Sequence, residues 1–299
     1  MRTNADAPTF DLQSHSTWSD GALDPAAVVA AAAAAGVTLL ALTDHDSVEG
    51  VSEALNAARD HAITVVPAIE VSTVDVLGDD FHVLGYGIDH TDPDFCARLT
   101  RWRADRAVHI DRMAAMLAEL DLPPDRAELE RRRAAGCAVG RPHLAAATIS
   151  ANRERLEAAG LAEPSAFLEV YLVPGKPAYC RRSMPTVADA IDAIHAAGGL
   201  AVWAHPFWDL ASPRDIAAAL ERFATLGLDG VEAFYVTHDR EQTVHLATLA
   251  DERGLLTTGS ADFHGPDHRE FSRFRAFELY GLEPNLGPIA HRRASARQR

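Results

Sequence analysis

Side chains that bind divalent metal ions stand at the ends of six short apolar runs in this chain. Imidazoles and carboxylates supply the nitrogen and oxygen ligands of metals such as zinc, manganese and iron, so several of them gathered at one place form a metal centre. One such residue after one run carries little information, whereas the same feature repeated along the chain indicates a shared site. The candidate ligands are His15, Asp20, His45, Glu70, His82, His205, Asp262 and His264, and Gln13 precedes His15 by two residues.

The apolar runs predict the strands that would position these side chains. Short runs rich in branched residues are typical of buried strands, and strands that alternate with helical segments form a parallel sheet or barrel. In such folds the sites gather at the carboxyl ends of the strands. Strands are predicted at 10–15, 37–43, 63–72, 81–88, 200–205, 231–236 and 256–262, with 274–280 as a candidate last strand, and helices at 25–35, 51–61, 186–197, 213–226 and 239–253. The predicted fold class is therefore α/β, a barrel of seven or eight strands.

The middle of the chain has a different character. No strand-like run occurs between about residues 90 and 180, where helical periodicity and charged residues dominate. Helical segments are predicted over 93–122, 126–133, 142–152 and 164–172. We therefore expect a discontinuous barrel formed by residues 1–92 and 183–299, and an all-helical insertion over 93–182 that covers the active site.

The composition restricts the partners and the compartment. Twenty-eight lysines and arginines stand against 43 aspartates and glutamates, and the net charge of −15 argues against binding long DNA through its phosphates. A small anionic substrate remains compatible, because local cations and metal ions can outweigh the overall charge. The three cysteines are isolated, residues 1–8 contain no apolar secretion signal, and no segment approaches a membrane span. These features predict a cytoplasmic protein with no membrane partner.

The order of the candidate ligands resembles that of the PHP family (polymerase and histidinol phosphatase), a set of metal-dependent phosphoesterases. The matching elements run in the order HxH, D, TDHD, E, H, AHP and DxH, and they cover most of the chain outside the helical stretch. The resemblance implies a distorted (β/α)7 barrel with two or three divalent ions, which would be Mn, Fe or Zn. It also implies three ligand sets, namely His15, Glu70 and Asp262, then Glu70, His82 and His205, and finally Asp20, His45 and His264.

Gln13 stands where the family pattern has the first histidine of HxH. An amide carbonyl is a neutral oxygen donor and a weaker metal ligand than imidazole. Gln13 is therefore a candidate ligand of a weaker or differently selective first metal, and the number of ions stays open between two and three.

Two segments of the helical stretch resemble a narrower branch of the family, the nucleotide 3′,5′-bisphosphate phosphatases and the related 5′–3′ exoribonucleases. The segments are Gly140-Arg141-Pro142-His143 and Gly175-Lys176-Pro177, and Lys176 is the only lysine in the chain. The resemblance implies that Arg141 and Lys176 bind substrate phosphate, with His143 as a further candidate. His238, which follows the strand predicted at 231–236, is another candidate at the rim.

The expected activity is hydrolysis of a small phosphomonoester by a metal-activated hydroxide, with His205 and Asp262 nearby. The favoured substrate is a nucleotide 3′,5′-bisphosphate that loses its 3′-phosphate, and a site that accepts a chain would also trim short RNA from its 5′ end. Alternatives left open are a phosphoesterase for histidinol phosphate or a cyclic phosphodiester, and a catalytically weak protein that binds metal or ligand. A deaminase or amidohydrolase would share the barrel and the metals, but it offers no role for Arg141 and Lys176.

Overall fold

A computed structural model describes residues 8–291 of the chain. Residues 1–7 and 292–299 lie outside the described part, so the prediction about a secretion signal falls almost entirely outside it. The chain divides into two compact units, of which one joins the segment up to Arg98 to the segment from Pro185, and the other spans Leu99–Met184.

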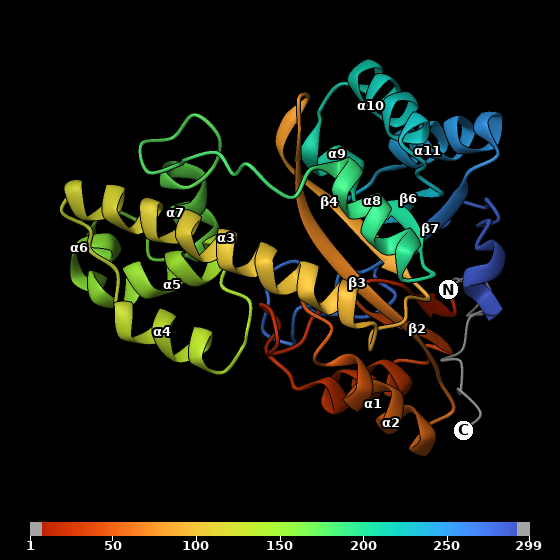
Figure 1. The fold of residues 1–299 in the computed structure, drawn as a ribbon, viewed down its shortest axis with the longest axis horizontal. Helices are drawn as coiled ribbons and strands as arrows, with labels where there is room; N and C mark the ends of the chain where they lie inside the picture. Colours follow the sequence, from red (N-terminus) through yellow and green to blue (C-terminus); the bar gives the residue numbers. More distant parts are fainter. Residues whose placement is uncertain (1–7, 292–299) are drawn as a thin grey trace. The chain divides into compact units, whose positions relative to one another are not determined.

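Seven strands form one mixed sheet in the first unit, and they follow one another in the sheet in the same order as in the chain (Figure 1). They are β1 (Phe10–Asp11), β2 (Leu39–Leu42), β3 (Thr64–Asp75), β4 (Gly78–Tyr86), β5 (Leu200–Trp203), β6 (Gly230–Tyr235) and β7 (Leu256–Ser260). Neighbours are parallel except around β4, which runs antiparallel to both β3 and β5. The first and last strands also meet, because the backbone N–H of Leu12 donates to Gly259 O at 3.1 Å and Ser14 forms a parallel bridge with Phe263. The sheet is thus a nearly closed, distorted barrel, and the predicted α/β fold class is confirmed.

The candidate last strand at 274–280 is wrong, since these residues form no strand. Phe274 instead stacks on Phe263 with ring centroids 4.2 Å apart, and Phe277 packs on Phe10 at 5.5 Å. The contact between β1 and β7 leaves no free sheet edge at this place for another strand to pair with. The apolar pattern of the segment therefore reflects burial against the barrel and not strand pairing.

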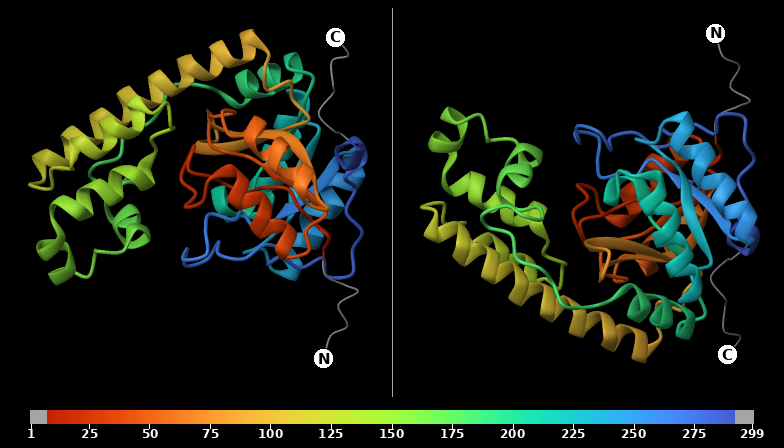
Figure 2. Two further views of the ribbon diagram at one scale, coloured as in Figure 1. Left: turned by 90° about the horizontal axis from the view of Figure 1, so that it is seen from below. Right: turned by 90° about the horizontal axis from the view of Figure 1, so that it is seen from above.

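Helices pack on the outside of the sheet (Figures 1 and 2). Helix α1 (Pro25–Ala34) lies beside α2 (Val51–Ala57) next to β2 and β3, α8 (Val187–Ala196) packs on β4 and β5, and α11 (Arg240–Arg253) packs on β6 and β7 beside α10 (Pro213–Thr225). Short helical turns are η1 (Ala58–Asp60), α9 (Pro206–Asp209) and η2 (Gly287–His291). Side chains fix where the longer helices begin, because Asp24 accepts a hydrogen bond from Ala27 N at 2.7 Å and Thr186 forms a capping box with Asp189.

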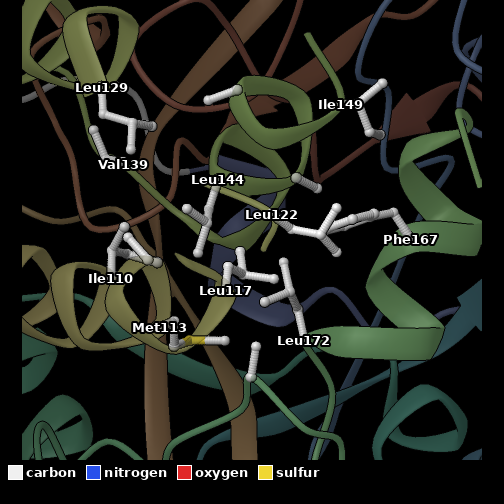
Figure 3. Packing of buried hydrophobic residues seen from close by; sticks show 14 of the residues in the cluster. Ile110, Met113, Leu117, Leu122, Leu129, Val139, Leu144, Ile149, Phe167 and Leu172 are labelled. Carbon is white, nitrogen blue, oxygen red and sulfur yellow. The ribbon is translucent and has the colours of Figure 1, made fainter. Parts of the chain in front are cut away.

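The second unit is helical and has its own apolar core (Figure 3). It contains most of α3 (Pro93–Glu119), with α4 (Arg126–Ala134), α5 (Arg141–Ala151), α6 (Arg153–Ala158) and α7 (Pro164–Tyr171). Met113 and Leu117 from α3 are fully buried with Leu144 from α5 and Phe167 from α7. None of residues 99–184, all of which are described, forms a strand. The predicted boundary at residue 93 is the start of α3, and the prediction that residues 93–182 cover an active site stays a prediction.

No helix within residues 8–291 combines the length and the apolar character needed to cross a bilayer.

Candidate metal centre

The candidate ligands enter one rim of the barrel from the strand ends. His15 follows β1, and its backbone N–H donates to Phe263 O at 2.8 Å, which ties it to the loop that carries Asp262 and His264. His45 follows β2 and forms a parallel bridge with Glu70, which lies within β3. His82 belongs to β4, where it pairs with Ser72, and because β4 is antiparallel its first half lies at the rim where the parallel strands end.

Two of the candidate ligands have a left-handed backbone. The φ angles are 30° at His205 and 50° at Asp262, a conformation that costs a non-glycine residue about 1–3 kcal/mol and needs support from its surroundings. Hydrogen bonds from the backbone to two acidic side chains provide this support. Glu232 accepts one from His205 N at 2.9 Å, and Asp11 accepts one from Ala261 N at 2.9 Å. Buried acidic side chains therefore hold the two strand ends in the form that presents His205 and Asp262.

The first group of side chains is His15, Glu70 and Asp262, all of them buried. His15 Nε2 lies 3.1 Å from Glu70 Oε2 and 3.1 Å from Asp262 Oδ1. None of these three buried atoms has a well-aligned hydrogen-bond partner among residues 8–291. Three lone-pair-bearing atoms thus converge without satisfying one another, which is expected of metal ligands.

The second group surrounds the other oxygen of Glu70. Its Oε1 lies 2.8 Å from His82 Nδ1 and 3.2 Å from His205 Nε2, and these two nitrogens are 3.2 Å apart. His45 approaches the same carboxylate, with Nδ1 at 3.4 Å from Glu70 Oε2. Glu70 is therefore shared, with one oxygen in each group, as a bridging carboxylate would be.

The third group surrounds Asp20. Its Oδ1 lies 3.5 Å from His264 Nε2 and 3.4 Å from His15 Nδ1, and its Oδ2 lies 3.7 Å from His45 Nε2. His15, Asp20, His45 and His264 offer ligand atoms that all lie within 4.8 Å of one another. The structure thus brings together all eight predicted histidine and carboxylate candidates in three adjoining groups.

The spacing of these atoms suits metal coordination. Two ligand atoms held at about 2.1 Å from one ion are about 3.0 Å apart at a right angle and about 3.4 Å apart at a tetrahedral angle. The separations of 3.1 Å around His15 Nε2 and 3.4 Å between His45 and Glu70 fall on these values. The His/Asp/Glu donor set is one that Mn, Fe or Zn accept. The residues present therefore fit divalent ions.

The carboxylates of the centre are strongly favoured in their charged form. Burial alone would raise the pKa of Glu70, but the imidazoles of His45 and His82 hold that pKa well below its usual range. Burial also opposes ionisation of Asp20, and His45 and His264 nevertheless hold its pKa well below its usual range. The centre is therefore negatively charged wherever its histidines are neutral.

The carboxylates of the centre raise the pKa values of His15 and His205. Burial lowers the pKa of His15, but the close carboxylates of Asp262 and Glu70 outweigh it and raise that pKa well above its usual range. His205 behaves in the same way, since burial lowers its pKa and the contact with Glu70 raises it to about 9. Without metal ions, protons on these rings would compensate the carboxylates, so protons and metal ions compete for the same atoms.

Gln13 is buried, but its surroundings differ from those of the histidines. Ser260 Oγ lies 3.5 Å from Gln13 Oε1 and donates to Glu232 Oε1 at 2.6 Å. The amide nitrogen of Gln13 has no hydrogen-bond partner among the described residues. The role of Gln13 as a ligand stays a prediction, and its carbonyl has Ser260 as a neighbour.

Several residues that support the centre are not among the predicted ligands. Asp44 accepts hydrogen bonds from Ser16 N at 2.7 Å and Ser19 Oγ at 2.6 Å, which fixes the loop that carries Asp20. Tyr235 donates its hydroxyl to Asp262 Oδ2 at 2.8 Å. The hydroxyl of Tyr235 thereby occupies one oxygen of Asp262 and leaves Oδ1 for the centre.

Glu232 and Asp209 also lie next to the centre. Burial raises the pKa of Glu232 to about 8 and that of Asp209 to about 7. Asp209 accepts a hydrogen bond from Trp203 Nε1 at 2.9 Å. A lone acid inside the apolar run Val231-Glu232-Ala233-Phe234 is a signal that could have identified Glu232 from the sequence.

The predicted phosphate contacts lie in different places. Arg141 and His143 are in the first turn of α5, where His143 Nδ1 accepts a hydrogen bond from Gly140 N at 3.1 Å, and Lys176 is exposed in a turn after α7. These three belong to the second unit, and their role stays a prediction. His238 belongs to the first unit and is buried, its Nδ1 lies 3.2 Å from Ala233 O, and burial lowers its pKa to about 4. The role of His238 as a substrate contact also stays a prediction.

A nearly closed barrel with clustered histidines and carboxylates at one rim defines a class of metal-binding α/β proteins. The sequence profile of the PHP domain matches residues 11–122. A 3′,5′-nucleoside bisphosphate phosphatase from Chromobacterium violaceum is 34% identical over 264 residues, which cover 86% of this chain and 87% of that protein. A 5′–3′ exoribonuclease, Rnm, from Escherichia coli is 32% identical over 262 residues, which cover 87% of this chain and 86% of that protein.

Two solved structures have a similar fold. A Chromobacterium violaceum protein described as an amidohydrolase, with bound sulfate and no metal, superposes with a TM-score of 0.77 at 29% identity and covers 91% of this chain and 95% of its own. A Bifidobacterium adolescentis protein described as a metal-dependent phosphoesterase gives a TM-score of 0.73 at 26% identity, over 89% of this chain and 91% of its own. The chain belongs to the PHP family.

Proposed function

We propose that this protein is a metal-dependent phosphoesterase whose rim binds two or three divalent ions of Mn, Fe or Zn. The observation that carries the proposal is the arrangement of Glu70, which is fully buried and has one oxygen in each of two groups of imidazoles and carboxylates. Ions bound there would lower the pKa of a coordinated water and neutralise a phosphate ester.

The protein's own residues have distinct tasks in this proposal. Glu70 fixes the distance between two groups of ligands, because its two oxygens are bonded to the same carbon atom. Tyr235 orients Asp262 by donating to Oδ2, and Glu232 orients His205 by accepting from its backbone N–H. Partners of this kind fix the direction of the ligands, and their loss commonly costs 10–100-fold in metal affinity or activity.

The proposed substrate is a nucleoside 3′,5′-bisphosphate that loses its 3′-phosphate, and short RNA trimmed from its 5′ end is a second substrate of the same site. The names of the relatives from Chromobacterium violaceum and Escherichia coli support this choice. We further propose that Arg141 and Lys176 bind substrate phosphate. A guanidinium and an ammonium supply the donors that phosphate oxygens require.

Phosphate release from adenosine 3′,5′-bisphosphate, AMP, histidinol phosphate and a cyclic phosphodiester tests the proposal, each with Mn²⁺ and with excess chelator. We expect chelator-sensitive release from the bisphosphate above all others, and shortening of a 5′-phosphorylated oligoribonucleotide from that end. Faster turnover of histidinol phosphate or the cyclic ester would overturn the choice of substrate. Metal-loaded protein that is silent on every ester would point to a catalytically weak binding protein.

A matched pair of variants tests the metal assignment. Asp262→Asn removes a charged ligand, and we expect at least about a 100-fold loss of turnover because metal ions contribute several kcal/mol to such reactions. Asp267→Asn alters an exposed aspartate on the same loop and is expected to leave turnover and metal content unchanged. Near-normal activity and metal content in Asp262→Asn, with an unchanged fold by circular dichroism, would refute the assignment.

A further inference from the structure

A continuous set of aromatic rings leads outward from the metal centre. Phe271 lies 5.4 Å from the ring of the candidate ligand His264, His268 stacks on Phe271 at 5.0 Å with an interplanar angle of 20°, and Trp208 lies 6.0 Å from Phe271. We refer to the three residues Trp208, His268 and Phe271 as the aromatic shelf. The shelf begins at the centre itself and ends at a ring on the surface.

Local hydrogen bonds hold the shelf in place. Trp208 N donates to His205 O at 2.8 Å, so the indole stands on the turn that follows a candidate ligand. On the other side, His264 N donates to Phe271 O at 2.9 Å, and Phe271 N donates to His268 Nδ1 at 3.0 Å. Both elements that carry the shelf are therefore anchored to residues of the metal centre.

The exposure of Trp208 is unusual for its residue type. The side chain is 58% exposed, and it is the one aromatic residue among the large apolar side chains that are exposed within residues 8–291. Phe271, beneath it, is only 8% exposed. An indole left open to solvent beside a buried ring offers a flat apolar surface to an aromatic ligand.

We infer that the aromatic shelf stacks against the nucleobase of the substrate. This inference rests on the proposed function, since a phosphate held at the metal centre carries its base one sugar away, within reach of an adjoining surface. Every base presents a flat π-face, so stacking of this kind is tolerant of base identity. A larger purine covers more of the rings than a pyrimidine does, and purine substrates are therefore expected to bind more tightly.

Two substrates separate base stacking from phosphate chemistry. One is adenosine 3′,5′-bisphosphate, and the other is the methyl riboside 3,5-bisphosphate, which has the same phosphates and no base. For Trp208→Ala we expect a rise in KM of about 5- to 100-fold on the adenosine substrate, the range that base–aromatic stacking gives, with kcat little changed. The methyl riboside is expected to be turned over equally well by the variant and the unmodified protein.

Control variants and a binding measurement complete the test. Trp208→Phe keeps a ring and is expected to restore most of the affinity, and Val76→Ala removes a side chain that is 79% exposed on the β3–β4 turn and takes no part in the shelf. AMP is expected to quench tryptophan fluorescence in the unmodified protein, and much less in Trp208→Phe. Metal content should be equal in all variants.

The outcomes are distinguishable. An equal loss on both substrates in Trp208→Ala, or no loss on either, would overturn the inference while leaving the phosphoesterase in place. If no protein turns over either substrate, the proposed function fails, and quenching by AMP alone then decides whether the shelf binds a base. Quenching that persists unchanged in Trp208→Phe would refute the shelf in that case.

Discussion

Metal binding to this protein should release protons and therefore tighten as the pH rises. The pKa of His205 is raised to about 9, so at pH 7 its protonated form exceeds its neutral form by about 100 to 1. An ion that needs the neutral ring must displace that proton, which costs about 3 kcal/mol at pH 7 and almost nothing at pH 9. The pKa values of His15 and His82 are also well above the usual range, so more than one proton is expected to leave.

The expected slope is at least about tenfold in apparent metal affinity per pH unit between pH 6.5 and 8.5. Isothermal titration of Mn²⁺ into ion-free protein, in buffers of different ionisation enthalpy, counts the protons directly. Replacing His205 by Gln should lower the count by about one proton, whereas His195→Gln, at an exposed ring paired with Asp229, should not change it. Affinity that changes less than threefold over these two pH units would refute the assignment of His205 as a protonated metal ligand.

The raised pKa of His205 also makes the stability of the ion-free fold depend on pH. Because the folded pKa of His205 lies above its unfolded value, its proton stabilises the ion-free fold fully below about pH 6.5, and this contribution is lost as the pH rises through about 9. Urea unfolding of ion-free protein should therefore show a declining contribution from this group over that range. Protein loaded with metal should lose this dependence. Above about pH 6.5 the ring of His205 is then neutral both in the metal-bound fold and in the unfolded chain.

Three further predictions concern single side chains. Gln13→His should tighten metal binding about tenfold by adding an imidazole donor, and unchanged metal content in a chelator competition would show that position 13 is not a ligand. Tyr235→Phe should weaken metal binding 10–100-fold by freeing the second oxygen of Asp262, which the same competition measures, and unaltered binding would leave Tyr235 with a packing role only. Lys176→Ala should raise KM for a nucleoside bisphosphate about tenfold with kcat preserved, and Lys176→Arg should recover part of it; steady-state kinetics that show no change in KM would remove Lys176 from the substrate contacts.

The fold could be predicted because its signals are local. Apolar runs bounded by helical segments identify β2, β3 and β5–β7, and the order of the strands in the sheet follows the order in the chain. The error at 274–280 arose because an apolar run records burial and not pairing. A run can form a strand only where a sheet edge is free to pair with it. Here the contact between Ser14 and Phe263, which lie far apart in the chain, closes that edge.

The candidate ligands could be predicted because they recur at strand ends, but the contacts of the residues that hold them could not. Asp44, Glu232 and Tyr235 act through hydrogen bonds to atoms distant in sequence, such as the 2.6 Å bond from Ser19 to Asp44. A buried acid or tyrosine in an apolar run has no spacing rule that identifies its partner. These contacts join the ends of neighbouring strands, namely β1 with β2, β5 with β6 and β6 with β7.

The crowding of imidazoles at the rim favours divalent ions over protons. The rings form a chain of contacts, with centroids 4.2 Å apart for His15 and His264, 4.7 Å for His15 and His45, and 4.9 Å for His45 and His82. Two protonated rings at about 4.5 Å repel by about 4 kcal/mol at an effective dielectric constant of about 20, so the cluster cannot protonate every ring. A divalent ion instead places its charge between the carboxylates and uses the lone pairs of neutral imidazoles, which satisfies both kinds of side chain at once. The arrangement therefore favours divalent ions over a full set of protons, which is the physical basis for assigning it to metal chemistry.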